Sequence, residues 1–438
     1  NQRQLEFEDF NLPFGGKLRS DNRWVKLAKF IPWGEFEKAY RKSFKNTRLG
    51  PPAKSVRVAL GSLIIKERLG TSDEETVEQI RENPYLQYFL GYKEYLDEKP
   101  FDPSLFVYFR KRFGKKRMAR INETIACKVL EEEANAIKSK SDDNGDDDPG
   151  TGTSGNRGKL LVDATCTPAD ITFPTDLKLL NTAREKSEEI INILHKPLKG
   201  SQKKPRTYRK VARKAFLAAA KSKRLSKNKM RKARRKQLGY LRRNLKTIEK
   251  LSRQTPLTVL RRHDYKNLLV IHEVYRQQQW LYDHRETRID DRIVSVSQPH
   301  VRPIKRGKAG AATEFGAKIS ASLIDGISFV DRISWDAYNE TGDLIGQLKA
   351  YRTRFGCYPE SVHADKIYRT RDNRKFCKKH GIRLSGPPLG RPPADVEKQK
   401  AIAKQARQDE LDRIPIEGKF GQGKRRFSLS RIICKLDI

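Results

Sequence analysis

A dense run of positive charge between residues 196 and 262 limits what this chain can fold into. These 67 residues hold 26 lysine and arginine side chains and one acid, Glu249. Without acids at helical spacing such a run repels itself, so it stays out of any core and favours an anionic partner. Alanine and leucine are frequent in it and favour long helices. We expect basic helices that contact phosphate groups; the alternative is a helical face that is only solvated by water.

The rest of the composition narrows the class of protein. The 438 residues carry 93 Lys+Arg and 54 Asp+Glu, a formal net charge of +39, and the mean hydropathy is −0.78. No apolar run approaches the ~20 residues that cross a membrane, and no signal peptide is recognisable at the beginning. The five cysteines form no CxxC pair, which fits a reducing compartment. We expect a soluble, cytoplasmic protein whose partner is a polyanion and not a membrane.

Composition also divides the chain into three parts. Residues 1–137 have the pattern of an all-α N-terminal domain, and residues 138–158 that of an acidic, flexible linker. Residues 159–438 form the third part, in which strand patterns begin. In the first part, short helices with tight turns favour a helix-turn-helix that binds DNA, with a plain bundle for packing or dimerisation as the alternative. Its helices are expected at 56–69, at 73–82, from Pro84 onward and at about 105–113.

After residue 158 the pattern alternates between strands and helices. The Asp325-Gly326 pair joins two strands and predicts a hairpin. The expected strands are 159–166, 315–323, 327–335, 358–365 and 382–385, with helices at about 341–355 and 370–380 and from about 394 onward. Once a helical insertion at about 177–290 is set aside, the order is β-β-β-α-β-α-β-α. We therefore predict an α/β fold: a ribonuclease-H-like mixed sheet with a long basic helical insertion, preceded by the all-α domain.

Three carboxylates stand where that fold carries its acids. Asp163 lies in the first strand, Asp365 ends the fourth, and Glu417 falls on the last helix. A carboxylate in an apolar strand is costly unless it is paired or binds a cation. The alternatives are a structural strand aspartate, a turn residue and a solvated helix residue, respectively. His363 is expected to be a packed side chain rather than a catalytic one. The competing acids are Asp170, Asp176, Asp331 and Asp336.

Several longer motifs surround these acids, and with them the chain resembles the DDE transposases of bacterial insertion sequences, in the branch with an insertion after the first strand. The motifs are Leu161-Val-Asp-Ala-Thr-Cys-Thr-Pro-Ala-Asp-Ile, Glu314-Phe-Gly-Ala-Lys, Val362-His-Ala-Asp-Lys-Ile-Tyr-Arg-Thr-Arg-Asp-Asn, Gly386-Pro-Pro-Leu-Gly-Arg-Pro and Ile416-Glu-Gly-Lys-Phe-Gly-Gln-Gly-Lys-Arg-Arg. The family pattern Tyr-x2-Arg-x3-Glu-x6-Lys is matched by Arg413, Glu417 and Lys424, with Glu410 at the tyrosine position. Pro415 predicts that a helix begins near it.

The resemblance implies a function. It implies a transposase that uses Mg²⁺, with Mn²⁺ as a substitute, to hydrolyse phosphodiester bonds at transposon ends and then transfers the freed 3′-OH into target DNA. Asp163, Asp365 and Glu417 would be the catalytic residues and metal ligands. The protein would act as at least a dimer on double-stranded DNA. Binding to DNA would keep it at the bacterial nucleoid. The expected DNA contacts are Arg413, Lys424 and Arg425 near the cut, and Arg231, Lys232, Arg234 and Arg235 on the insertion.

Two other functions stay open at this point. One is a related metal-dependent nuclease that cuts DNA without joining it. The other is a DNA-binding remnant without catalysis, since the chain begins at Asn1 and ends at Ile438 and is expected to be a fragment. A structural RNA-binding protein would account for the basic run but not for the three carboxylates.

Overall fold

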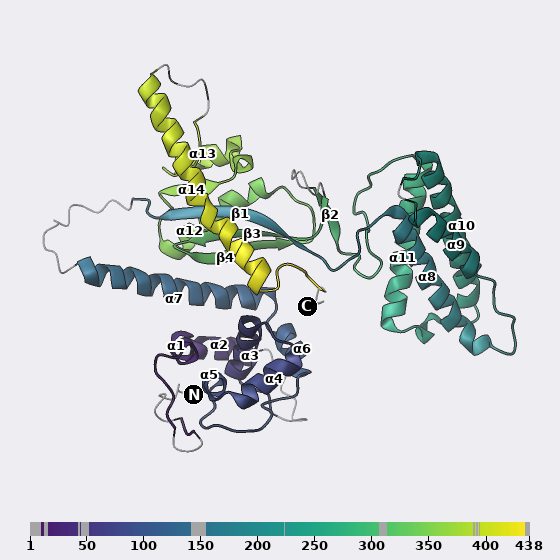
Figure 1. Cartoon of the computed structure of the whole chain (residues 1–438), viewed down its shortest axis with the longest axis horizontal. Helices are drawn as coiled ribbons and strands as arrows, with labels where there is room; N and C mark the ends of the chain where they lie inside the picture. The colour runs from purple at the N-terminus through teal and green to yellow at the C-terminus, as the bar shows by residue number, and fades with distance from the viewer. Residues whose placement is uncertain are drawn as a thin grey trace.

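The computed structural model of the chain describes residues 10–12, 16–42, 44, 52–141, 155–222, 224–305, 313–388, 390, 393 and 395–433 (Figure 1). Most of the linker expected at 138–158 lies outside these residues. In the part of the chain that is described, no helix combines the length and the apolar character needed to cross a membrane.

The N-terminal part is helical, as predicted. Ser55 and Ser72 cap the second pair of helices through the N–H groups of Val58 and Glu75, and Gly70, with a φ of 70°, ends the first of that pair. The predicted helices at 56–69 and 73–82 are confirmed, whereas the first two helices were not predicted. The helices are α1 (Arg23–Phe30), α2 (Trp33–Arg41), α3 (Val56–Leu69), α4 (Asp73–Glu82), α5 (Pro84–Leu90) and α6 (Leu105–Arg112).

A long helix, α7 (Lys115–Ser141), connects this part to the sheet. Ile121 belongs to the apolar core of the N-terminal helices. Ala126 and Leu130, further along α7, are buried in the core of the sheet. In Figure 1, α7 runs between the N-terminal helices and the sheet. One helix therefore contributes to two cores.

The sheet is mixed, and its central strand is the one that carries Asp163. The strands are β1 (Lys159–Pro168), β2 (Arg302–Lys305), β3 (Thr313–Ile324), β4 (Ile327–Ser334), β5 (Ser361–Ala364) and β6 (Arg383–Leu384). Strand β1 pairs antiparallel with β3 and parallel with β5, β5 pairs parallel with β6, and β3 also pairs with β2 and β4. Strand β2 was not predicted, since four residues that include Pro303 give no readable alternation.

Helices cover the sheet, and the last of them crosses its surface. After the 3₁₀ turn η5 (Glu340–Asp343) come α12 (Leu344–Phe355), a second turn η6 (Lys366–Tyr368), α13 (Arg371–Lys379) and α14 (Val396–Arg426). Figure 1 shows α14 lying across β1 and β3. Ile416 and Phe420 of α14 pack against Leu161 of β1 and Leu323 of β3.

The prediction that a helix begins near Pro415 is wrong, because Pro415 lies inside α14. A proline in a helix removes the hydrogen bond to the carbonyl four residues earlier. That carbonyl belongs to Leu411, and both residues lie on the exposed side of the helix. Water can therefore solvate the freed carbonyl, which lets the helix continue.

The insertion is a separate helical bundle between β1 and β2 (Figure 1). Its core contains Leu180, Ile191, Leu241 and Ile271, while its lysines and arginines lie mostly on the outside. The bundle consists of α8 (Asp176–His195), η3 (Lys196–Leu198), α9 (Arg209–Ala220), α10 (Lys227–Ser252), η4 (Leu257–Val259) and α11 (Arg262–Asp283). The expectation of long basic helices in this segment is confirmed.

Charge connects α7 to the sheet. Arg354 of α12 donates from Nη2 to Glu123 Oε2 of α7 at 3.1 Å and lies 3.9 Å from Asp331 Oδ1 of β4. Burial raises the pKa of Asp331, while its hydrogen bonds from Gln347 and Ser322 act in the opposite direction. Arg354 is therefore a cation that lies close to one acid of α7 and one acid of β4.

We predict that Arg354→Met lowers the free energy of unfolding by about 2–3 kcal/mol, because it leaves the buried Asp331 without a cation. Chemical denaturation measures the loss. Arg352→Met is the matched control: Arg352 is exposed on the same helix, and its stacking on Tyr358 is worth less than about 1 kcal/mol. Equal losses in the two variants would contradict the role given to Arg354.

Candidate active site

The pairing of β1 with β5 places two of the three predicted acids side by side. Their parallel register ends with Val162 opposite Ala364, so that Asp163 and Asp365 are the next residues on the two strands. Asp163 lies in the sheet with 17% of its side chain exposed, whereas Asp365 is exposed. Asp365 Oδ1 accepts a hydrogen bond from the N–H of Lys366 at 2.6 Å and thereby caps η6.

Helix α14 brings the third acid to the same place. Arg413 and Glu417 lie one turn apart, and Arg413 Nη2 is 2.9 Å from Glu417 Oε1. The other nitrogen, Nη1, is 3.5 Å from Asp163 Oδ2. One guanidinium group thus bridges the helix and the central strand. Glu417 keeps 54% of its side chain exposed, which leaves its carboxylate open to a ligand.

Asp163 holds its proton more tightly than an exposed carboxyl does. Burial raises the pKa of Asp163 from 3.8 to about 6, and the charges of Glu340 and Asp365 act in the same direction. The N–H of Ala164 and the nearby Arg413 oppose the shift. Sequence reasoning missed Glu340, which is ion-paired with Lys318. Burial and the neighbouring acids therefore outweigh the effect of Arg413 on Asp163.

These residues fit a divalent cation in chemical type. All three acids offer carboxylate oxygens, which Mg²⁺ and Mn²⁺ prefer. Asp163 also stands near the charges of Glu340 and Asp365, which an added cation would offset. Across the described ranges, no three histidine, cysteine or acidic side chains are already gathered closely enough to hold a metal ion. The site has the right donors, and its present contacts pair two of them with Arg413.

The remaining basic residues predicted on α14 lie at its end. Lys424 is half-buried and Arg425 is exposed, both in the last turn. Arg413, Glu417 and Lys424 are separated by four and seven residues, which places them on one face of a helix. This face therefore carries an acid with a cation on either side of it.

The four basic residues predicted on α10 point in different directions. Arg231 stacks on the ring of Tyr282 of α11, with its guanidinium carbon 4.1 Å from the ring centroid. Arg234 lies 3.4 Å from Asp176 at the beginning of α8 and is mostly covered. Two of the four are thus engaged within the bundle. The other two are exposed to solvent: Lys232 and Arg235.

The competing acids have other partners. Asp176 accepts hydrogen bonds from Arg292 at 2.5 Å and from Gln278 at 3.1 Å, and it belongs to the N-terminus of α8. Asp170 is paired with Arg431. Asp331 faces α12, as described above, and Asp336 lies in an exposed turn after β4. Each of the four therefore has a structural setting of its own, away from Arg413.

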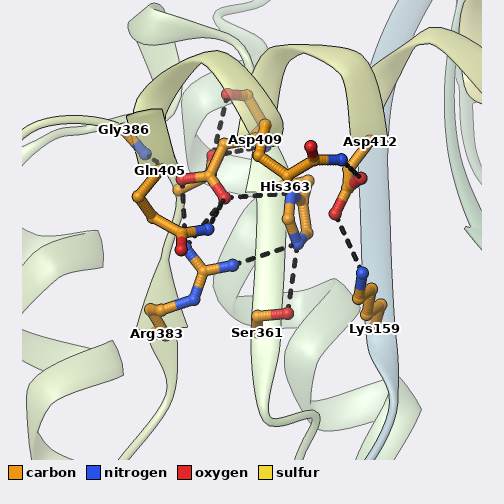
Figure 2. Close-up of polar contacts among 11 residues, drawn as sticks. Lys159, Ser361, His363, Arg383, Gly386, Gln405, Asp409 and Asp412 are labelled. Atoms are coloured by element: carbon orange, nitrogen blue, oxygen red, sulfur yellow. Dashed lines mark hydrogen bonds and ion pairs between the residues drawn. The ribbon is translucent and has the colours of Figure 1, made fainter. Parts of the chain in front are cut away.

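A buried carboxylate that sequence reasoning missed holds α14 on the sheet (Figure 2). Asp409, with 4% of its surface exposed, accepts two hydrogen bonds from Arg383 Nη1 of β6 at 2.8 and 3.0 Å. It also accepts the N–H of Gly386 at 2.8 Å and Gln405 Nε2 at 3.1 Å. His363 Nδ1 of β5 lies 3.7 Å away. Burial acts to raise the pKa of Asp409, but these bonds outweigh it and lower the pKa.

His363 is a packed residue, as expected, and part of this network. It is fully buried, and burial lowers its pKa. Its Nε2 is 3.1 Å from Ser361 Oγ and 3.5 Å from Arg383 Nη2. A neutral ring that accepts at Nε2 carries its proton on Nδ1, toward Asp409. A second, more exposed tie joins Asp412 Oδ2 to Lys159 Nζ at 2.9 Å (Figure 2).

One sequence signal marks Asp409. The buried residues of α14 are Asp409, Ile416 and Gly423, at a spacing of seven. This spacing defines the stripe that faces the sheet, and an aspartate in such a stripe indicates a buried, partnered carboxylate. Glu417 follows Ile416 directly, so the contacts of the stripe fix where the third acid stands.

Comparisons with known proteins give matches to two parts of the chain. A model of the transposase DDE domain matches residues 362–437, which include Asp365, α14 and Glu417, and a model of a transposase domain called DUF772 matches residues 13–112. Both matches are to transposase domains, so the chain is similar to transposases over these two segments. A Rhizobium meliloti protein named uncharacterized protein ORF8 in nfe locus is 30% identical over 155 residues, which are 35% of this chain and 66% of that protein. No solved structure matches the chain.

The raised pKa of Asp163 predicts a pH-dependent cost of folding without a divalent cation. The unfolded carboxyl ionises near 3.8 and the folded one near 6, so ionisation destabilises the fold as the pH rises between these values. Asp163→Asn removes this cost, and at neutral pH in a chelator it should raise the free energy of unfolding by up to about 3 kcal/mol. Denaturation curves over pH measure it, and an unchanged or lower stability at neutral pH would contradict the prediction.

The Asp409 network predicts that the conservative change Asp409→Asn destabilises the protein. Arg383 and the N–H of Gly386 lose their charged acceptor, which should cost about 2–3 kcal/mol in chemical denaturation. Asp412→Asn on the same helix is the control. The partner of Asp412, Lys159, exposes 59% of its side chain, so that loss should stay below about 1 kcal/mol. If the two variants lost the same stability, Asp409 would not be the main anchor of α14.

Proposed function

We propose that this chain is a transposase that cuts DNA at transposon ends by Mg²⁺-dependent phosphodiester hydrolysis and joins the freed 3′-OH to target DNA. The observation that carries the proposal is that Asp163 stands beside Asp365 on paired strands and is joined to Glu417 through Arg413. The match of the transposase DDE domain over two of these acids supports it.

The strand arrangement supports the finer assignment of a ribonuclease-H-like catalytic domain at residues 159–438. Such a sheet has three antiparallel strands followed by two parallel ones, with acids on the first strand and after the fourth. Here the order β4-β3-β1-β5-β6 follows that plan, with β2 added beside β3 and the helical insertion at about 177–290 between β1 and β2. Asp163 and Asp365 occupy the two expected positions.

The residues of the chain suggest how the site acts. Asp163, Asp365 and Glu417 would hold the divalent cations, which activate the attacking oxygen and stabilise the leaving oxygen in this chemistry. Arg413 and Lys424, on the same face of α14, donate to phosphate oxygens and hold the scissile strand against the acids. For Asp163 to act as a charged ligand, its carboxyl must give up its proton, and its pKa of about 6 allows this near neutral pH.

DNA would contact other parts of the chain as well. We assign residues 1–137 as a DNA-binding domain, supported by the matching transposase domain at 13–112. On α6, Arg110 pairs with Asp73 and Arg112 lies over Phe44, which leaves Lys111 as the exposed cation of that trio. The exposed Lys232 and Arg235 add contacts on the insertion. Because two ends must be held together for joining, the active form would be at least a dimer on DNA.

Asp365→Asn tests the proposal. We expect it to abolish Mg²⁺-dependent cleavage and joining of DNA that carries the ends flanking the gene, while DNA affinity is kept, because an amide is a poorer ligand than a carboxylate. Gel assays of cut and joined products, with Mn²⁺ in parallel, measure both steps.

Asp336→Asn is the control, an exposed acid outside the site whose variant should cut and join like the wild type. Equal activity in Asp365→Asn and the wild type would remove Asp365 from the site and overturn the mechanism. Cleavage without a joined product would instead point to a nuclease, and DNA binding without either step would point to an inactive DNA-binding protein.

A further inference from the structure

Tyr208, at the beginning of α9, has a backbone conformation that a bulky residue rarely adopts. Its φ is 55° and its ψ is 23°, in the left-handed region. Such a conformation costs free energy for a residue other than glycine and persists where its surroundings or its function require it. The hydroxyl makes no capping bond to α9. The contacts of its ring therefore indicate the role of Tyr208.

Two arginines, one from the loop before α9 and one from α10, stack on this ring. The guanidinium carbon of Arg206 is 4.7 Å from the ring centroid of Tyr208, and that of Arg243, from α10, is 4.6 Å away. Arg243 also lies 5.5 Å from the ring of Tyr240. The tyrosines are half-buried, and both arginines are exposed. We call these four residues, Arg206, Tyr208, Tyr240 and Arg243, the arginine–tyrosine ladder.

The ladder holds two positive charges close together without a neutralising acid. Within the described part of the chain, neither Arg206 nor Arg243 has a carboxylate at ion-pair distance. Arg253, at the end of the same helix, differs in this respect, since it lies 3.0 Å from Glu249. Like charges held against one ring repel each other, and an anion that bridges them would relieve the repulsion.

The packing of the bundle sets the position of the ladder. Gln237 Nε2 of α10 donates to the carbonyl of Ala212 of α9 at 3.1 Å, which holds the two helices together at a buried point. One turn of α9 before Ala212 is Tyr208, and less than two turns of α10 after Gln237 is Arg243. Tyr208, at the beginning of α9, and Arg243 of α10 are thus held at a fixed relative position.

We propose that the arginine–tyrosine ladder binds phosphates of the backbone of double-stranded DNA. The inference deepens the proposed function, on which it rests, and it adds a contact site apart from the three carboxylates. Stacking fixes the plane of a guanidinium group and leaves its N–H groups free to donate to phosphate oxygens in pairs. Phosphate contacts carry no base information, so the ladder positions DNA of any sequence.

The test measures equilibrium binding of the full chain to a duplex of arbitrary sequence, by fluorescence anisotropy over a series of salt concentrations without divalent metal. Arg206→Ala and Arg243→Ala should each weaken binding about tenfold, as expected for a lost charge-assisted contact. Each should also make the slope of log affinity against log salt shallower by about 0.9. Tyr208→Ala should weaken binding, while Tyr208→Phe keeps the ring and should bind like the wild type.

Arg253→Ala is the matched control, because it removes the same charge from the same helix at a residue that is already paired. Thermal melts of all variants establish that each is folded. If Arg206→Ala and Arg243→Ala changed affinity and slope no more than Arg253→Ala, or if Tyr208→Ala bound like the wild type, the inference would be overturned while the proposed function stood. A wild-type chain that did not bind DNA would overturn both.

Discussion

The hydrogen bonds of one buried carboxylate hold the last helix, α14, on the sheet, although this helix lacks a broad apolar face. Helix α14 has 31 residues, yet its buried stripe consists of Asp409, Ile416 and Gly423. A buried carboxylate is costly unless it is hydrogen-bonded, and Asp409 accepts hydrogen bonds from donors of β6, the loop after it and α14 itself. Directional bonds fix both the position and the rotation of a helix, whereas apolar contacts alone allow it to slide. The geometry of the candidate site follows from this anchor.

Burial and neighbouring charges also determine the protonation of the candidate site. Asp163 is mostly buried and close to other acids, so its proton is held more tightly than usual. Arg413 reaches it from α14 and at the same time pairs with Glu417. A cation supplied by the helix thus stands among the acids that would hold divalent cations. Binding of those ions and a shift of the Arg413 side chain toward a phosphate are therefore expected to occur together.

The sequence predicted the parts of the fold that local patterns control. The helices at 56–69 and 73–82, the hairpin at Asp325-Gly326 and the basic helices of the insertion all rest on caps, turns and periodicity within a few residues. The positions of Asp163 and Asp365 were expected from the likeness of the strand order to a ribonuclease-H-like fold. Features that depend on long-range contacts could not be predicted. Strand β2 is too short to show a pattern. The prediction at Pro415 was wrong because the solvent exposure of this residue cannot be read from the sequence.

The site was predicted less completely for the same reason. Asp163, Asp365 and Glu417 stand out by their place in the strand order, but Asp409 and Glu340 are recognised through partners more than twenty residues away in the sequence. Similarly, Arg231 and Arg234 belong to the same basic run as Lys232 and Arg235, yet they contact Tyr282 and Asp176 inside the bundle. Counting charges in the sequence predicts the sign of a surface. It does not predict which of the charged side chains are free to contact a ligand.

Helix α7 has a consequence for how the two ends of the chain work together. Its 27 residues form a rod of about 40 Å, and its side chains enter the core of the N-terminal helices at Ile121 and the core of the sheet at Leu130. Nine residues separate these positions, about 14 Å along the axis. Any rotation of the N-terminal helices about this rod would disturb the packing beneath β4. The helix therefore sets a fixed offset between the N-terminal helices and the carboxylates of the candidate site.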